Sequence, residues 1–99
     1  MKFTLYEGGV RGAALIFSPL IKNNSRVSKG KIHMVDWLPT LYAAAGGTLT
    51  DLKNIDGLNQ WDSIKYAKKS PRNSMLLNID ETAGLEGAIV GKYKLIKGT

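Results

Sequence analysis

The stretch from Lys2 to Gly12 (Lys-Phe-Thr-Leu-Tyr-Glu-Gly-Gly-Val-Arg-Gly) constrains the fold more than any other part of this chain. Its glycine pair, Gly8-Gly9, indicates a turn, because glycine accepts backbone conformations and close approaches that other residues resist. An almost continuous apolar run, residues 13–18, follows directly and ends at Pro19. Such a run is typical of a strand buried on both faces, in a parallel sheet covered by helices. The sequence therefore predicts an α/β fold.

A helix is predicted within residues 32–45. Asp36 is a suitable N-cap, and Pro39 is tolerated in the first turn of a helix because its missing N–H is not needed there. Apolar residues recur at helical spacing from Trp37 onward. The pair Gly46-Gly47 then favours an end to the helix on its C-terminal side.

The C-terminal part of the chain predicts short elements. Residues 48–60 are expected to form a polar loop with a turn at residues 55–57, and residues 61–67 a short helix. Residues 68–72 have the composition of a linker. Three strands are then expected, and the last two can pair as a hairpin across Gly91-Lys92. These strands are residues 74–79, 87–90 and 93–96.

Composition sets broad limits on what the chain can do. Its 99 residues suffice for one small domain, and a hydrophobic content of 43% argues against disorder. The formal net charge is +6, but the basic residues are scattered, so most are expected to be solvated. There is no cysteine, which excludes disulfides, zinc–thiolate sites and a cysteine nucleophile. No apolar run is long enough for a transmembrane helix, and the N-terminus does not have the pattern of a signal peptide.

Five blocks of the sequence resemble type I sulfatases, in the same order as in that family. The first, Lys2–Gly12, resembles K-x-[ST]-x-x-E-G-G-V-R-G, and the second, His33–Leu41, resembles H-I-x-D-W-L/Y-P-T-L. The other three are residues 56–61, 70–80 and 87–96, which resemble D-G-x-D-x-W, S-P-R-x-x-x-L-H-N-I-D and A-I-R-x-G-x-W-K-L-I. The D-W-L-P-T and H-N-I-D forms are most similar to the arylsulfatase B group, with its arylsulfatase I and J relatives.

This resemblance implies that the chain is a fragment from the C-terminal half of a sulfatase. Residues 1–68 are then expected to belong to the large α/β domain, which is similar to alkaline phosphatase in architecture. Residues 69–99 are expected to begin the small C-terminal antiparallel subdomain. Both parts would be incomplete. We therefore expect the isolated chain to be marginally stable or prone to aggregation, because a buried strand needs neighbours for its backbone hydrogen bonds.

The resemblance also implies hydrolysis of a sulfate ester, carried by a glycosaminoglycan or a small aryl sulfate, in the full-length form. In the family a formylglycine hydrate attacks sulfur, while calcium and fixed cations stabilise the sulfuryl oxygens. Lys2 matches the lysine that contacts the sulfate, so it is the expected catalytic and substrate-binding residue. The C/S-x-P-x-R context of formylglycine and the calcium ligands are not found in this sequence. The 99 residues alone are therefore expected to be inactive, with no metal site of their own.

Two positions depart from the family pattern. Leu77 stands where H-N-I-D has its histidine, and Ile89 stands where A-I-R has its arginine. Both are expected to be peripheral to the chemistry. Glu7 and Arg11 are expected to stabilise a turn through their charges, and His33, the single histidine, to serve the entry into the helix.

Other conspicuous residues have structural explanations. Asp36 and Asp56 are accounted for by a helix cap and a turn, without a metal. Trp37 and Trp61 are expected in the core. Asn23-Asn24-Ser25 is a sequon, which makes Asn23 a candidate for N-glycosylation. The resemblance implies a lysosomal or secreted location, where such a glycan is plausible.

Two other functions compete with this interpretation. A non-catalytic module could use its basic surface to bind sulfated glycans or nucleic acid. For the sulfatase itself a nucleic-acid partner is not expected, and the oligomeric state stays open. A different enzyme of the wider phosphatase-like superfamily is disfavoured, because E-G-G-V-R together with D-W-L-P-T is similar to sulfatases specifically.

Overall fold

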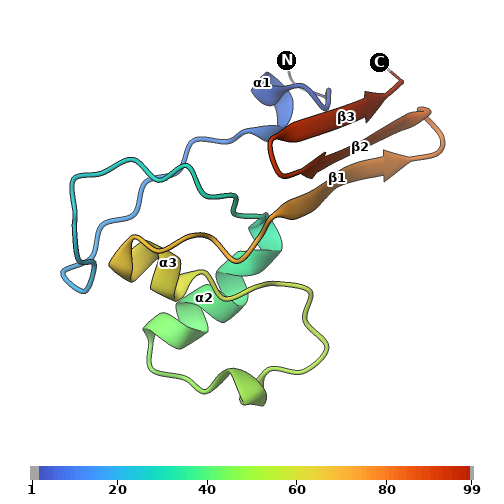
Figure 1. The fold of residues 1–99 in the computed structure, drawn as a ribbon. Helices are drawn as coiled ribbons and strands as arrows, with labels where there is room; N and C mark the ends of the chain where they lie inside the picture. The colour runs from blue at the N-terminus through green and yellow to red at the C-terminus, as the bar shows by residue number, and fades with distance from the viewer. Residues whose placement is uncertain (1–2, 99) are drawn as a thin grey trace. The chain divides into compact units, whose positions relative to one another are not determined.

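The computed structural model describes residues 3–98, and these form two compact units that are considered separately (Figure 1). The first unit combines the residues up to Ile16 with those from Asn73 onward. The second unit is the continuous stretch Phe17–Arg72. Within residues 3–98, no helix has the length and apolar character needed to cross a membrane. The described chain is a small α/β structure in which helices and strands occupy different stretches of sequence.

The first unit is built on a three-stranded antiparallel sheet in the order β1-β2-β3. Its strands are β1 (Ser74–Asp80), β2 (Leu85–Val90) and β3 (Tyr93–Lys97). The hairpin between β2 and β3 turns at Gly91, whose φ of 59° lies in the left-handed region that glycine adopts without strain. The predicted strands and hairpin are confirmed.

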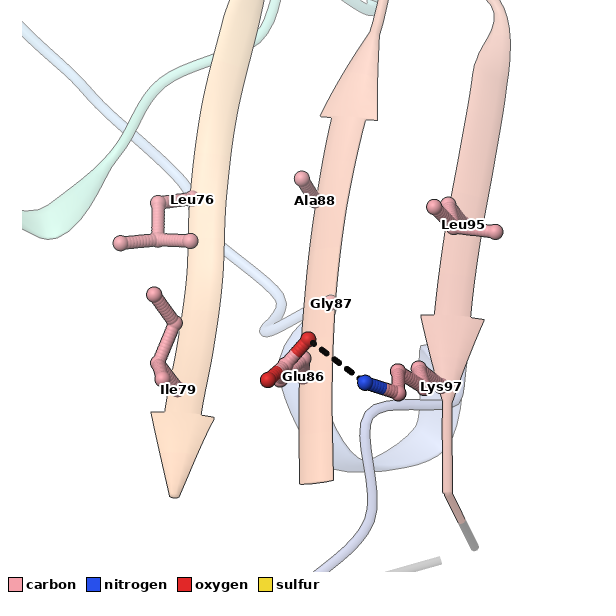
Figure 2. Close-up of a pocket in the computed structure, with 7 residues that line it drawn as sticks. All are labelled: Leu76, Ile79, Glu86, Gly87, Ala88, Leu95 and Lys97. Atoms are coloured by element: carbon pink, nitrogen blue, oxygen red, sulfur yellow. Dashed lines mark ion pairs between the residues drawn. The ribbon is translucent and has the colours of Figure 1, made fainter. Parts of the chain in front are cut away.

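One face of this sheet is apolar and exposed. A bulge in β1 between Leu76 and Asn78 shifts the register, so that Leu76 and Ile79 share that face. A shallow groove of about 200 Å³ runs over it, lined mostly by apolar side chains and bordered by the ion pair of Glu86 with Lys97 at 3.7 Å (Figure 2). Five large side chains on this face are more than half exposed: Leu76, Ile79, Val90, Tyr93 and Leu95.

The opposite face of the sheet is covered by the start of the chain. Leu5 is only 6% exposed and is the one large aliphatic side chain in residues 3–98 that is fully buried. A Cβ at Gly87 in β2 would lie 2.8 Å from the Leu5 Cδ1, so glycine at this position permits the close approach. Helix α1 (Glu7–Val10), a single turn, follows Leu5. A buried core this small offers little hydrophobic stabilisation, and the marginal stability of the isolated chain stays a prediction.

The second unit contains short helices joined by coil. They are the 3₁₀-helix η1 (Met34–Asp36), α2 (Trp37–Ala44), the 3₁₀-helix η2 (Leu49–Asp51) and α3 (Trp61–Tyr66). Pro39 lies in the first turn of α2, and Gly46, with φ of 90°, follows its end. The Gly46 and Gly47 N–H groups donate to the carbonyls of Ala43 and Tyr42 at 3.0 and 2.9 Å. Both predicted helices are confirmed, and Trp37 and Trp61 are half-buried within this unit.

Two local predictions are wrong. Residues 13–18 form no strand, and Leu15 and Phe17 are 95% and 90% exposed. An apolar run becomes a buried strand only beside partner strands, and the one sheet in residues 3–98 is antiparallel and does not include it. The expected α/β arrangement around a parallel sheet is therefore not seen. No turn forms at residues 55–57 either, because Gly57 instead lies directly against the Val35 carbonyl.

Candidate functional site

Lys2, the residue that the family resemblance assigns to catalysis, lies outside the described residues. What the structure describes is the segment that directly follows it. Leu5 anchors this segment to the sheet by burying its side chain against Gly87. Tyr6, half exposed, then occupies the N-cap position of α1. The assignment of Lys2 stays a prediction, but its neighbours in the chain are held on a sheet.

An ion pair also ties this segment to the sheet. The Lys94 Nζ in β3 donates to the Glu7 Oε1 at 2.7 Å, and the Arg11 guanidinium lies 3.7 Å from the other carboxylate oxygen. The hydrogen bond from Lys94 lowers the pKa of Glu7 below its ordinary value of 4.5, and the nearby positive charge of Arg11 acts in the same direction. The prediction that charges stabilise this turn is confirmed. Lys94, which sequence reasoning did not identify, is its main partner.

A cluster of hydrogen-bonded polar groups in the second unit surrounds Asp36. Its carboxylate is completely buried, with 0% exposure. Arg72 approaches it with two nitrogens, Nε to Oδ2 at 2.8 Å and Nη2 to Oδ1 at 2.6 Å. This is the bidentate geometry that suits a guanidinium and a carboxylate best. The pair joins the start of α2 to the segment that leads into β1.

Three further groups donate to the same carboxylate. They are the backbone N–H of His33 at 2.8 Å, the backbone N–H of Leu58 at 2.9 Å and the Gln60 Nε2 at 3.3 Å. Burial alone would raise the pKa of Asp36, but the hydrogen bonds from Arg72 and from these groups outweigh it and lower the pKa to about 2. The same pairing raises the pKa of Arg72. Asp36 is therefore a fully satisfied structural anion.

Gln60 extends this network to two more segments. Its backbone N–H donates to the Thr40 Oγ1 at 2.9 Å, and its side-chain nitrogen donates to the Lys31 carbonyl at 3.1 Å. The Ser70 hydroxyl lies within hydrogen-bonding distance of the Gln60 Oε1, at 3.0 Å. Gln60 and Thr40 are both almost completely buried, and no buried side-chain nitrogen or oxygen in the described residues lacks a hydrogen-bond partner. The second unit is thus held by polar contacts where many domains use a hydrophobic core.

The structure refines the role that the sequence gave to Asp36. Asp36 occupies the N-cap position of α2, but its side chain makes no capping bond there. It instead accepts from the His33 N–H, while the His33 Nδ1 accepts from the Val35 N–H at 3.2 Å, a reciprocal capping box for η1. The prediction that His33 serves the helix entry is confirmed. Sequence reasoning missed Arg72, because nothing local indicates that it meets a residue 36 positions earlier.

No metal site is found among residues 3–98. No group of three or more His, Asp or Glu side chains gathers in this part of the chain. The most buried carboxylate, Asp36, is already saturated by Arg72 and neutral donors, which is the environment of an ion pair and not of a cation ligand. The described residues therefore do not fit a calcium ion.

The sequon lies on an exposed bend of the second unit. Asn23, Asn24 and Ser25 are all exposed, and Asn23 and Ser25 have positive φ angles of 49° and 59°. No hydrogen bond of the Asn23 side chain to another described residue is seen, although its carbonyl accepts from the Arg26 Nη1 at 3.2 Å. Glycosylation of Asn23 is sterically open and stays a prediction.

Comparison with known proteins identifies arylsulfatases among the relatives of this chain. The chain is 40% identical to mouse arylsulfatase J over 79 residues, which are 80% of this chain and 13% of that protein. It is 37% identical to human arylsulfatase A and 35% identical to bovine arylsulfatase A, in each case over 94% of this chain and 18% of the relative. No family model matches the chain. The chain spans less than a fifth of the length of these relatives, and its homology to them supports its place in the sulfatase family.

Proposed function

We propose that this chain is part of an arylsulfatase that hydrolyses sulfate esters, of the arylsulfatase B-like group. The observation that carries the proposal is the 40% identity with mouse arylsulfatase J over 80% of the chain. The D-W-L-P-T and N-I-D blocks favour the B-like group, which acts in this proposal on a glycosaminoglycan or a small aryl sulfate. A lysosomal or secreted location goes with it.

In this proposal Lys2 contacts the sulfate group. A sulfuryl group in transfer carries negative charge on its oxygens, and a fixed cation aimed at them lowers the barrier. A lysine side chain is flexible, so the stabilisation that it gives to the sulfuryl oxygens depends on how firmly its backbone is held. The burial of Leu5 and the Glu7–Lys94 pair, three and five residues further on, support this role because they fix the chain that carries Lys2.

Calcium and the formylglycine nucleophile belong to the proposed whole enzyme. Calcium would offset the charge of the sulfuryl oxygens when bound. The described residues support this proposal only through Leu5 and Glu7, which are held against the sheet. The 99 residues by themselves are expected to hydrolyse no sulfate ester.

The test is to sequence the transcript that contains this segment and to assay its longest in-frame product on a fluorogenic aryl sulfate. We expect an in-frame C/S-x-P-x-R coding segment and measurable hydrolysis. Lys2→Ala should reduce kcat by roughly 10²–10³, the usual effect of removing one such charge-stabilising group. Lys53→Ala, which removes an exposed lysine of the second unit, is the matched control and should leave kcat unchanged. Equal activity of the two variants would exclude the role of Lys2.

Binding of a polyanion without catalysis is the second candidate function. It is favoured by the uneven distribution of charge: residues 17–72 carry nine Lys and Arg against four Asp, a formal balance of +5 in a chain whose total is +6. Such a field attracts anionic chains and steers their association. This function is independent of a catalytic nucleophile.

A further inference from the structure

Positive charges converge at the C-terminal end of α3. The Lys65 Nζ lies 5.1 Å from the centroid of the Tyr66 ring, and the Lys68 Nζ lies 5.5 Å from the same centroid. Tyr66 is 44% exposed, Lys68 is exposed and Lys65 is half-buried, so this cluster lies at the surface of the second unit. The two lysines, although three positions apart in sequence and separated by the end of the helix, are thus gathered around one aromatic side chain.

A second segment adds two more basic residues to this place. The Lys22 N–H donates to the Lys65 carbonyl at 2.8 Å, which fixes the backbone of Lys22 beside the end of α3. The Arg26 guanidinium donates to the Ser63 carbonyl at 3.3 Å and also to the Ile64 carbonyl. A cation at these last carbonyls is favourable because the C-terminal end of a helix is its negative end.

These charges are not neutralised within the described part of the chain. The ion pairs seen in residues 3–98 involve Arg11, Arg72, Lys94 and Lys97, and none involves Lys22, Lys65 or Lys68. The nearest carboxylate in sequence, Asp62, lies in the first turn of α3 and forms no ion pair with them. Like charges gathered without an acidic partner repel one another, and an anionic ligand relieves that repulsion.

We propose that Lys22, Lys65, Tyr66 and Lys68, the lysine surface, bind a sulfated polysaccharide chain. The inference rests on the second candidate function and assigns it a place and a ligand. Free lysine side chains lose much rotamer entropy when they bind an anion. Here Tyr66 already holds two of them through cation–π contacts, which reduces the ordering that binding requires.

The composition of the lysine surface favours a sulfated glycan over a nucleic acid. Single-stranded nucleic acids bind by stacking bases on free aromatic faces, but ammonium groups already lie over the Tyr66 ring. The side chains are lysines, which act as point charges for sulfate oxygens, and they lack the planar fork with which arginine reads bases. Helix α3, with six residues, is also too short to serve as a groove-reading helix.

The test compares two double variants of the full chain, each with two fewer positive charges. Lys65→Gln with Lys68→Gln removes the two lysines of this surface that lie over the Tyr66 ring. Lys53→Gln with Lys92→Gln is the matched control, since Lys53 is exposed and Lys92 lies alone over the Tyr93 ring. Affinity for a heparin oligosaccharide, followed by calorimetry over a range of salt concentrations, is the readout. A poly(dT) oligonucleotide of equal charge is the competing probe.

We expect the first variant to bind heparin about tenfold more weakly, with a shallower salt dependence, and the control to change by less than about threefold. If both variants bind heparin equally weakly, the lysine surface is not the binding place, although the chain still binds polyanions. If poly(dT) binds more tightly than heparin, the preferred ligand is not a sulfated glycan. No binding of heparin by the unmodified chain would overturn the second candidate function as well. Because Lys65 is helical, Lys22→Gln in the coil is a further variant, expected to weaken binding about threefold with unchanged tryptophan fluorescence.

Discussion

Replacing Arg72 by leucine should unfold much of the second unit, because it leaves a buried carboxylate without its counter-charge. Asp36 is completely buried, and the Arg72 side chain is only 14% exposed. In the variant, Asp36 keeps the neutral donors of His33, Leu58 and Gln60. It loses the two hydrogen bonds from the Arg72 guanidinium. Breaking a buried ion pair by removing one partner costs about 3–5 kcal/mol. We expect about 3 kcal/mol here, because the neutral donors remain.

The pH dependence of stability gives this prediction a second, independent signature. The pKa of Asp36 is lowered from 3.8 to about 2 in the folded chain, which corresponds to roughly 2 kcal/mol of stabilisation by its partners. A lowered folded pKa means that this stabilisation is fully present above pH 4 and is lost as pH falls from about 4 to 2. In Arg72→Leu the main cause of the lowering is gone and burial acts against it, so this acid-side loss should shrink.

Urea unfolding followed by tryptophan fluorescence measures both effects, because Trp37 and Trp61 lie in the second unit. Lys53→Gln, an exposed change in the same unit, is the control and should stay within about 0.5 kcal/mol of the unmodified chain. If Arg72→Leu falls within the same range, or keeps the full acid-side loss, the reasoning about the buried pair is refuted.

Three further outcomes follow from single contacts. Gly57→Ala should destabilise the second unit by about 1–3 kcal/mol in urea unfolding, because its Cβ would run into the Val35 carbonyl, whereas Gly12→Ala meets no atom within 4 Å and should be neutral. Lys94→Met should return the pKa of Glu7 toward 4.5 in an NMR titration. Lys97 pairs with Glu86 instead, so Lys97→Met should leave the pKa of Glu7 lowered. When the chain is expressed through a secretory lumen, Asn23 should gain a glycan, seen as an increase in mass that an amidase removes. Asn23→Gln and Ser25→Ala should each abolish this mass increase. An increase that survives Asn23→Gln would contradict Asn23 as the glycosylation site.

Local patterns sufficed for the elements that depend on local chemistry. The hairpin of β2 and β3 was predictable because Gly91 supplies a turn between two short apolar segments. Helix α2 was predictable because Pro39 and Gly46 mark its beginning and its end. In both cases the residues that decide the structure lie within the element or next to it.

The features that depend on distant partners could not be predicted. Residues 13–18 have the composition of a buried strand, but composition cannot tell whether neighbouring strands exist to satisfy the backbone. The sequence suggested that Gly57 forms a turn, but a glycine is needed there because the Val35 carbonyl lies too close for a side chain. Asp36 suggested a cap, and only the fold brings Arg72 to it. The site residue Lys2 came from resemblance to a family, and no pattern within the chain would have selected it.

The first unit is made from the two ends of the chain, and this has a consequence for synthesis on the ribosome. Leu5 needs Gly87 as its packing partner, so it has to wait until the intervening chain has been translated. At about 5–20 residues per second, this delay lasts roughly 5–15 seconds. The second unit is continuous in sequence and can form during that interval. Until then Leu5 stays uncovered, and an uncovered apolar side chain on a growing chain is the kind of site that chaperones bind.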